Sequence, residues 1–536
     1  MGFDYVIVGA GSAGCVLANR LSADPAARVL LLEAGGSDRN LNVKIPAAFG
    51  NQFHTKLDWE YWTEPEPHVD DRSLYIPRGK CLGGSSSMNA MLYVRGRPVD
   101  YGAWEAAGGE GWGWESVLPY FLRSEDNVRG PSEHHGAGGP LRISEQRSPR
   151  RLNADFLHAA HAAGIPNIPD YNGPEQDGSS MFQVTQHDGR RWSAADAFLR
   201  PALGRANLEV VTHAQVLGLE LERGRAIGVR YRDRWRRTRV VGADAEVILA
   251  AGAIGSPQLL LLSGIGPADE LGAVGITTKH DLPGVGRNLQ DHPFVTMLYE
   301  VNDDHTLYGA DKPRPLAEWL LRRSGPLTST AAEAVAFVRT RAGLPAADIQ
   351  FHFGAMYYED HGQEEFEGHA MTIAPVLVSP RSRGRLWLRS ADPRDKPRIL
   401  TGSLSEPEDV ASLVAGMELA RKHAATEPLA SKVVRELKPG PATNDLESAL
   451  RRRLELIYHP VGTCSMGSGE EAVVDAALRV RGVDALRVID ASVMPVIPGG
   501  NTNAPTIMVA ERGADLILGR AGGARPQSAP DHAAVG

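Results

Sequence analysis

The first 33 residues constrain the fold of this chain more than any other segment. An apolar run at residues 3–8 predicts a short buried strand, residues 14–22 predict a helix, and residues 28–32 predict a second buried strand. Three glycines spaced as GxGxxG lie between the first strand and the helix, which is the context that a dinucleotide-binding βαβ unit requires. We therefore predict an α/β fold that contains a Rossmann-like nucleotide-binding domain.

Each position of this glycine pattern has a physical role. Among Gly9, Gly11 and Gly14, one makes a tight turn, one lets the backbone approach a pyrophosphate, and one lets the helix pack on the strand. The positive end of the helix then faces the diphosphate. Glu33 ends the second strand, 19 positions after Gly14, where a carboxylate accepts the ribose hydroxyls of an adenosine and repels the 2′-phosphate of NADP. The pattern alone does not separate FAD from NAD.

Composition excludes several other classes of protein. The chain has 536 residues and a formal net charge of −8, which is not the charge of a general nucleic-acid binder. No uncharged apolar run approaches the ~20 residues that span a bilayer. The N-terminus has no signal-peptide pattern, so we predict a cytoplasmic protein and leave peripheral membrane contact open. The three cysteines are far apart and predict neither a disulfide framework nor a metal site.

Two further glycine-rich segments bear on the choice of dinucleotide. Residues 79–93 contain a run of two glycines and three serines, which can wrap a flat polar ring, and residues 252–266 follow a predicted strand. These segments match the two signatures of the glucose–methanol–choline (GMC) oxidoreductases, a family of flavoproteins that the chain resembles over residues 3–519. The resemblance implies FAD as the cofactor and a small-molecule alcohol as the substrate.

The resemblance also implies how the domains are organised. An FAD-binding domain of the Rossmann-like GMC type is expected from residues 1–155, 197–296 and 455–519. A discontinuous α+β substrate-binding domain with an antiparallel sheet is expected from residues 156–196 and 297–454. We expect residues 520–536, which are rich in Gly, Ala and Pro, to form a disordered tail.

By the same resemblance, several separated segments contact FAD. The glycine loop and Glu33 hold the ADP half, and Val216 meets the adenine with its backbone. Met88 stands where some relatives carry a histidine bonded covalently to the flavin, so we predict non-covalent FAD. The predicted FAD-binding residues are Gly9, Gly11, Ser12, Ala13, Gly14, Glu33, Ala34, Gly83, Ser85, Met88, Asn89, Ala90, Met91, Leu92, Val216, Ala251, Gly252, Asp490, Ala491, Asn501 and Thr502.

The resemblance assigns catalysis to His459 and Asn503, which are 44 positions apart. Pro460 restricts His459 to an extended backbone, so the imidazole projects from a rigid turn. We predict that neutral His459 takes the hydroxyl proton of the alcohol while its α-carbon gives a hydride to flavin N5. Asn503 is predicted to donate a hydrogen bond to the developing alkoxide. The alternative is that Asn503 only caps the helix predicted at residues 505–518.

The substrate pocket is predicted to include Glu333, His352, Tyr458 and Trp59. Glu333 resembles the glutamate that faces the trimethylammonium group in choline-oxidising relatives, although an edge-strand position turned to solvent is the alternative reading. His352 and Ser379 depart from the pattern of choline oxidases. We therefore predict a neutral primary alcohol, aliphatic or aromatic.

Several features of the reaction stay open at the level of the sequence. The electron acceptor is O₂ in an oxidase and a quinone or redox partner in a dehydrogenase. The alternatives to simple alcohol oxidation are choline dehydrogenation and a flavin-containing hydroxynitrile lyase, which would use the same histidine without net redox. The chain is predicted to be a monomer or a homodimer.

Overall fold

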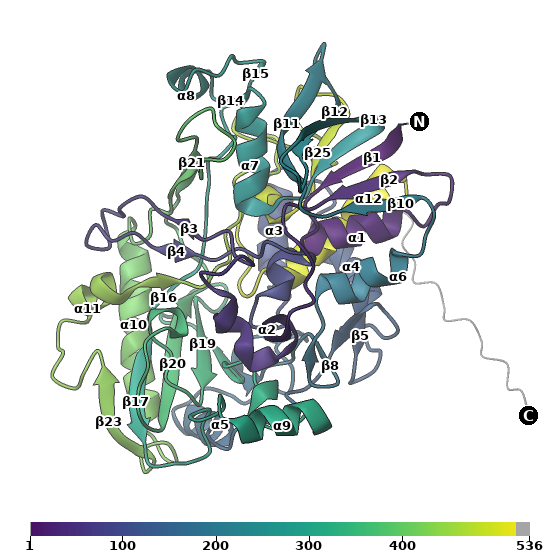
Figure 1. The fold of residues 1–536 in the computed structure, drawn as a ribbon. Helices are drawn as coiled ribbons and strands as arrows, with labels where there is room; N and C mark the ends of the chain where they lie inside the picture. Colours follow the sequence, from purple (N-terminus) through teal and green to yellow (C-terminus); the bar gives the residue numbers. More distant parts are fainter. Residues whose placement is uncertain (1, 521–536) are drawn as a thin grey trace, which may run out of the picture.

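The computed structural model describes residues 2–520, and these form two large sheets joined by helices and loops. Figure 1 shows the first sheet at the top and the second at the lower left. The first sheet has seven strands in the order β10-β2-β1-β13-β12-β11, with β25 beside β13. Its strands are β1 (Phe3–Val8), β2 (Val29–Leu32), β10 (Leu208–Val211), β11 (Gln215–Glu222), β12 (Arg225–Arg232), β13 (Thr238–Leu249) and β25 (Leu486–Val488).

The parallel part of the first sheet contains the βαβ unit predicted from the sequence. β1 pairs in parallel with β2 and with β13, and β10 and β25 continue this arrangement on either side. All four residues of β2 are buried, as expected for a strand covered on both faces. Helix α1 (Ser12–Leu21) follows β1, so the predicted helix is confirmed and begins two residues earlier than expected. β11, β12 and β13 add an antiparallel ribbon at one edge.

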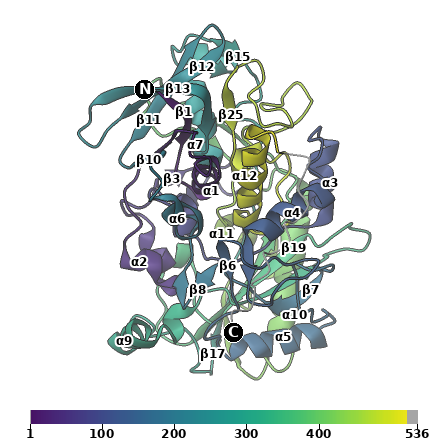
Figure 2. The same cartoon turned by 90° about the vertical axis from the view of Figure 1, so that its right-hand side faces the viewer.

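Two helices from opposite ends of the chain pack together beside this sheet. Figures 1 and 2 show the purple α1 next to the yellow α12 (Asn503–Ile517), and the two helices are in contact. The buried carboxylate of Glu511 on α12 pairs with Arg20 of α1 at 2.6 Å and with Arg123 at 2.6 Å. The last helix thus completes a core that the first residues begin.

The second sheet has eight strands, and every pairing in it is antiparallel. Helices α5 (Leu152–Ala162) and α10 (Pro407–Ala424) pack on this sheet. The side chain of His352 lines a large cavity on the other face of the sheet. The two sheets are interleaved along the chain, whereas the domain boundaries themselves stay a prediction. The strands are β7 (Gly178–Met181), β16 (Pro293–Phe294), β17 (Met297–Val301), β18 (Ala334–Val338), β19 (Ile349–Gly354), β20 (Ala370–Leu377), β23 (Val433–Lys438) and β24 (Glu455–Leu456).

The remaining elements are short. Five small two-stranded sheets pair β3 (Tyr61–Trp62) with β4 (Tyr75–Ile76), β5 (Glu125–Asn127) with β6 (Leu141–Ile143), β8 (Gln186–His187) with β9 (Arg190–Arg191), β14 (Ile265–Gly266) with β15 (His280–Asp281), and β21 (Arg385–Trp387) with β22 (Arg398–Leu400). The other helices are α2 (Leu41–Lys44), α3 (Pro98–Ala106), α4 (Trp114–Ser124), α6 (Arg200–Ala202), α7 (Gly252–Leu262), α8 (Ala268–Ala273), α9 (Pro313–Arg322) and α11 (Leu446–Arg453).

Two predictions concern the chain as a whole. Among the helices of residues 2–520, none combines the length and the apolar character needed to cross a bilayer. The disordered tail predicted for residues 520–536 lies, apart from residue 520, outside the described residues.

Candidate active site

A cavity runs between the two sheets, from the carboxyl ends of β1, β2 and β13 to the inner face of the antiparallel sheet. At its first end, three glycines have three different surroundings. Gly9 has φ +99°, and a Cβ there would lie 2.6 Å from the carbonyl oxygen of Ala250. A Cβ on Gly14 would lie 1.8 Å from the carbonyl oxygen of Gly9, whereas a Cβ on Gly11 would meet only the Ala250 oxygen at 4.0 Å. Gly9 therefore makes a tight turn, and Gly14 makes a close packing contact. Gly11 is the position where the backbone is open to the cavity.

Glu33 lies in the same end of the cavity and fastens the glycine loop. Its Oε2 accepts a hydrogen bond from the backbone N–H of Ala10 at 2.8 Å, and its Oε1 accepts one from Gly35 at 2.8 Å. Burial raises the pKa of this carboxyl to about 7, against the opposing effect of the two amides. Each oxygen keeps a second lone pair, so Glu33 can accept hydrogen bonds from the two hydroxyl groups of a ribose.

Asp490 is in the cavity wall, but its side chain serves the protein itself. One oxygen accepts from the backbone N–H of Gly252 and the hydroxyl of Ser256, and the other accepts from the N–H and hydroxyl of Ser492. All four lone pairs of the carboxylate are therefore occupied. The part of Asp490 that remains for a ligand is its main chain.

The predicted FAD-binding residues line this cavity with two exceptions, Gly14 and Gly83. Gly14 makes the packing contact described above. Gly83 has φ +86° and precedes the 3₁₀ helix Gly84–Ser87, and the wall is formed by its neighbour Gly84 instead. A Cβ on Gly84 would lie 2.7 Å from the Cα of Gly11, so the two glycine-rich segments touch. Contact of these residues with FAD stays a prediction.

At the other end of the cavity, His459 is held by three polar neighbours. Its backbone N–H donates to Oδ1 of Asp291 at 2.7 Å, its Nδ1 lies 3.0 Å from Nδ1 of His292, and its Nε2 lies 3.3 Å from Nδ2 of Asn501. Burial, together with His292, His352 and the positive charge of Arg78, holds the pKa of His459 well below its usual range. The imidazole is therefore neutral at physiological pH.

This network determines which nitrogen of His459 is basic. The Asn501 amide accepts from Gln350 with its oxygen and donates with Nδ2, so Nε2 of His459 accepts. A neutral ring then carries its proton on Nδ1, where it donates to Nδ1 of His292. Burial lowers the pKa of His292 to about 3, which keeps His292 neutral and able to accept. The lone pair at Nε2 is thus the base that His459 offers to the cavity.

Asn503 is placed differently from the prediction in one respect. Helix α12 begins at Asn503 itself, and Thr502 is the N-cap residue, so the alternative that Asn503 caps this helix is wrong. The Asn503 side-chain oxygen accepts a hydrogen bond from the hydroxyl of Ser12 at 2.7 Å. This contact leaves its Nδ2 group as a donor in the wall of the cavity. The asparagine that hydrogen-bonds to His459 is Asn501, which we predicted from the sequence to contact the cofactor.

Three of the four predicted pocket residues, Trp59, His352 and Tyr458, line the cavity, and Glu333 does not. The Glu333 carboxylate accepts hydrogen bonds from the backbone of Arg150 and the side-chain amide of Asn153, at the start of α5. Its placement in the pocket is therefore corrected. Regular alternation from Val335, which pairs with His352, would turn this side chain toward the cavity. The backbone is irregular at Glu333, because its N–H donates to β19 whereas its carbonyl accepts from the segment after β7 on the other side, and the carboxylate reaches α5 instead. The rest of this end is mostly apolar and includes Phe49, Phe53, Phe294, Met356, Tyr358, Ala374 and Ile457.

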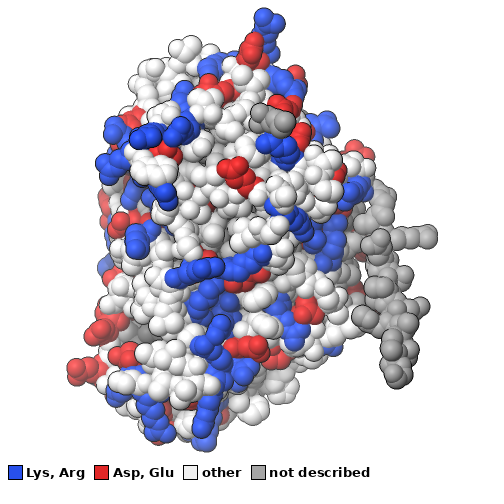
Figure 3. Space-filling model, turned by 45° about the vertical axis from the view of Figure 1, so that its right-hand side comes forward, with Lys and Arg blue, Asp and Glu red and all other residues white. Residues whose placement is uncertain are grey.

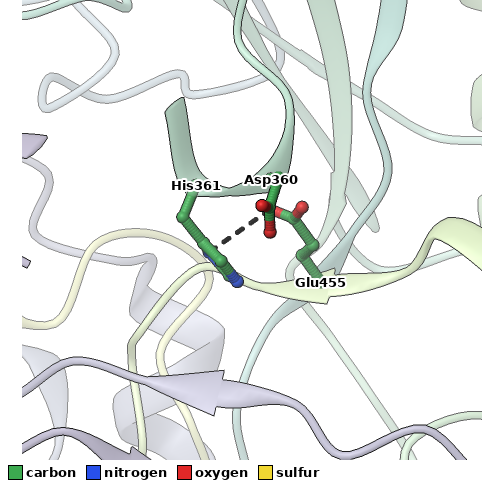
Figure 4. Close-up of side chains that lie close together, drawn as sticks. All are labelled: Asp360, His361 and Glu455. Atoms are coloured by element: carbon green, nitrogen blue, oxygen red, sulfur yellow. Dashed lines mark ion pairs between the residues drawn. The ribbon is translucent and has the colours of Figure 1, made fainter. Parts of the chain in front are cut away.

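Tyr458 is supported from behind by a polar group. Its hydroxyl bonds to Nδ1 of His361 and lies 3.4 Å from the hydroxyl of Tyr358. Figure 4 shows His361, Asp360 and Glu455 converging on one another, and among residues 2–520 they are the one such group of three metal-ligand types. Burial raises the pKa of Glu455 to about 8. Because Nδ1 of His361 is engaged by Tyr458, we interpret this group as a support for the tyrosine.

Sequence reasoning missed His292 and Asp291, which hold His459 from 167 and 168 positions away. One signal for them exists in the sequence. The chain has 17 histidines, and only His292 and His459 are followed by proline. Proline restricts the backbone of the preceding residue, so both imidazoles project from extended segments, and here they meet.

Comparison with known proteins identifies the family. Residues 3–294 and residues 380–510 each match a sequence profile described as GMC oxidoreductase. An alcohol dehydrogenase [acceptor] of Pseudomonas putida is 44% identical over 527 residues, covering 96% of each chain. The mitochondrial choline dehydrogenase of Homo sapiens is 44% identical over 535 residues, covering 97% of this chain and 90% of the relative.

Solved structures agree with these sequence matches. Pyridoxine 4-oxidase from Mesorbium loti superposes with a TM-score of 0.88 at 34% identity, covering 96% of this chain and 98% of the other. A formate oxidase superposes with a TM-score of 0.90 at 30% identity, covering 97% and 98%. The chain belongs to the GMC oxidoreductase family. It is an FAD-dependent oxidoreductase that acts on the CH–OH group of its donors.

The contact between the two imidazoles leads to a prediction for His292. Replacing His292 with Leu leaves the Nδ1 proton of His459 without an acceptor. We expect this to raise the activation free energy of flavin reduction by about 1–3 kcal/mol and to slow reduction ~10- to 100-fold. In His292→Asn, the amide oxygen takes the place of Nδ1, so this variant should keep most of the rate. Anaerobic stopped-flow reduction of FAD-loaded protein measures both. Equal rates in the two variants would contradict the role given to His292.

Proposed function

We propose that this protein oxidises a neutral primary alcohol, aliphatic or aromatic, to the aldehyde, with His459 as the base. The observation that carries the proposal is the neutral Nε2 of His459, which faces a cavity that is apolar around it and continuous with the dinucleotide loop. The electrons pass to O₂ or to a quinone-type acceptor. The cytoplasmic location and the monomeric or homodimeric state remain predictions of the sequence.

The apolar lining supports a neutral substrate. The carboxylates in the cavity wall are Glu33 and Asp490, both engaged near the dinucleotide loop, and Asp395. None of the residues around His459 in that wall is a carboxylate, and Glu333 contacts α5 instead. A buried quaternary ammonium ion requires compensating charge or an aromatic cage.

Choline remains the second candidate, because one observation favours it. Phe49, Phe53, Tyr358 and Tyr458 all line the cavity, and four aromatic rings can bind an ammonium group by cation–π contact. Choline dehydrogenases are also among the relatives at 43–44% identity. A flavin-containing hydroxynitrile lyase is the third candidate, since a base at the same position would serve it.

The residues of the chain divide the work of the reaction. Bound FAD supplies the acceptor for a hydride from the alcohol carbon. Nε2 of His459 takes the hydroxyl proton, and a positioned base of this kind contributes typically ~10²–10⁴-fold. Nδ2 of Asn503 donates to the alcohol oxygen as negative charge develops there. Asn501 holds the imidazole before substrate enters.

The cofactor is proposed to be held without a covalent bond. The wall position next to Asn89 is Met88, which is 4% exposed and has a thioether side chain with no nucleophilic nitrogen. The cradle consists of the Gly11 opening, the Glu33 carboxylate and the N-terminus of α1, which together fit a diphosphate and a ribose.

An anaerobic visible spectrum tests this function directly. Holoenzyme is mixed with choline, benzyl alcohol, hydroxymethylfurfural and a medium-chain alkanol in turn. We expect the flavin band to bleach with a neutral alcohol and more slowly with choline; readmitted air then distinguishes rapid reoxidation by an oxidase from slow reoxidation by a dehydrogenase. Bleaching by choline alone would move the assignment to choline. A flavin band that no alcohol bleaches, with cyanohydrin cleavage present, would favour the lyase.

A further inference from the structure

Helix α9 (Pro313–Arg322) has one face in the core and an apolar tip in solvent. On the inner face, Trp319 is buried with Ile45 and Leu327, and its indole N–H donates to the carbonyl of Gly189 at 2.8 Å. On the outer face, Leu320 is 50% exposed and Leu321 is 84% exposed. Leu321 is the most exposed large hydrophobic side chain among the described residues. The packing of Trp319 keeps these leucines in place on the surface.

Cations lie at both ends of this helix and form no ion pairs with carboxylates among the described residues. Lys312, Arg314, Arg322 and Arg323 lie on or beside α9, and within residues 2–520 none of them has a carboxylate within 4.0 Å. Arg323 lies over the Trp319 ring at 4.0 Å, and burial together with the positive charge of Arg190 lowers its pKa. In Figure 3, a run of blue side chains extends from the middle of the face to its lower edge, the end of the molecule at which Figure 1 places α9.

Nearby carboxylates reduce this charge without cancelling it. Glu318 turns back to accept a hydrogen bond from Ser324, and Asp311 and Asp188 are exposed in the adjoining loops. The chain as a whole has a net charge of −8, so an anionic surface repels most of the molecule and attracts this end. A short helix with exposed leucines and unpaired cations is the composition of an interfacial helix.

We propose that α9 docks on an anionic lipid bilayer. Leu320 and Leu321 enter the boundary between headgroups and acyl chains, and Lys312, Arg314 and Arg322 bind the phosphates from the interface. A lipid bilayer fits this helix better than an acidic protein does. The exposed leucines match the acyl chains, and the nearby cations match the phosphates of the headgroups. The docking does not depend on which alcohol the enzyme oxidises.

The position of α9 connects the docking surface to the cavity. α9 packs on the 3₁₀ helix Pro326–Thr328, which in turn contacts the 3₁₀ helix Pro46–Gln52. Phe49 in the second of these helices lines the apolar end of the cavity, and so do Thr330 and Ala331 just after the first. A docked enzyme would therefore hold this end of the cavity close to the bilayer, from which apolar alcohols and quinone-type acceptors partition. This consequence alone rests on the proposed function.

Vesicle co-sedimentation of the FAD-loaded full chain tests the proposal. We expect the protein to bind vesicles containing phosphatidylglycerol at least ~10-fold more tightly than vesicles of pure phosphatidylcholine. Leu320→Gln with Leu321→Gln should weaken binding to the anionic vesicles at least ~10-fold, since both apolar contacts are lost. Arg314→Glu with Arg322→Glu should do the same. Bound protein is measured on gels, so the readout is independent of activity.

The control is Leu203→Gln, which changes a leucine that is also 50% exposed but lies beside α6. This variant should bind vesicles like the wild type, and all variants should reduce their flavin with a water-soluble alcohol at the wild-type rate. Wild-type protein that stays in the supernatant with anionic vesicles would overturn the proposal. Binding that the leucine substitutions leave unchanged would overturn the insertion of α9 and indicate adsorption by charge alone.

Discussion

Replacing His459 with Ala should leave FAD bound and slow its reduction by substrate at least ~10²-fold. The hydroxyl group of an alcohol has a pKa far above 7, so the hydride leaves efficiently only if a positioned base accepts the hydroxyl proton. We propose Nε2 of His459 as that base, because burial and neighbouring groups lower the pKa of this imidazole and keep it neutral. Anaerobic stopped-flow spectroscopy of the flavin band, with FAD content measured in the same sample, gives both quantities.

A glutamine at this position separates proton acceptance from positioning. His459→Gln keeps a polar side chain beside His292 and Asn501 but has no basic nitrogen, so it should be as slow as the alanine variant. A glutamine variant close to the wild-type rate would mean that His459 only positions other groups.

The pH dependence of flavin reduction follows from the same site. Burial and the neighbouring His292, His352 and Arg78 lower the pKa of His459, which means that protonation, and loss of the base, occurs only at unusually low pH. The reduction rate should therefore stay on its plateau when the pH falls through about 6.5, the pKa of an ordinary histidine.

The parts of the site that sequence predicts best depend on local chemistry. Gly9, Gly11 and Gly14 come after β1, and Glu33 directly follows β2, so one short βαβ unit places all four at the same edge of the sheet. The backbone requirements at these positions come from contacts within the unit, such as the 1.8 Å approach that excludes a side chain at Gly14. Such contacts need no knowledge of the rest of the chain.

The parts that sequence could not predict depend on which distant segments meet. Glu333 looked like a pocket residue, but it lies next to a strand whose two faces are covered by different elements, α5 on one and the cavity on the other. The choice between these faces depends on the docking of α5, and the partners of Glu333 lie 180 and 183 positions away. The same is true of His292, whose role exists only because β16 and the segment before Pro460 are brought together.

The second large effect is expected at Gly11. Gly11→Ala should fold and yet retain FAD at least ~10²-fold more weakly. In the structure, a Cβ at Gly11 meets nothing closer than the Ala250 oxygen at 4.0 Å, so the methyl group fits within the protein itself. It would occupy the space through which the backbone approaches a pyrophosphate, and two lost hydrogen bonds to a charged group, at about 1.5–3 kcal/mol each, correspond to this loss of affinity.

Gly272→Ala is the matched control, because a Cβ at Gly272 also meets no atom within 4 Å but projects from α8, away from the cavity. It should retain FAD like the wild type. Gly14→Ala provides the contrast: its methyl group would overlap the Gly9 carbonyl, so it should lower the stability of the fold as well.

Titration of FAD into each apoprotein gives the affinities, and circular dichroism follows the fold. Acid precipitation of the wild type should release all of its flavin. If Gly11→Ala bound FAD as tightly as Gly272→Ala, the open space at Gly11 would not be the diphosphate site. Flavin that stayed with the acid-precipitated protein would instead contradict non-covalent binding.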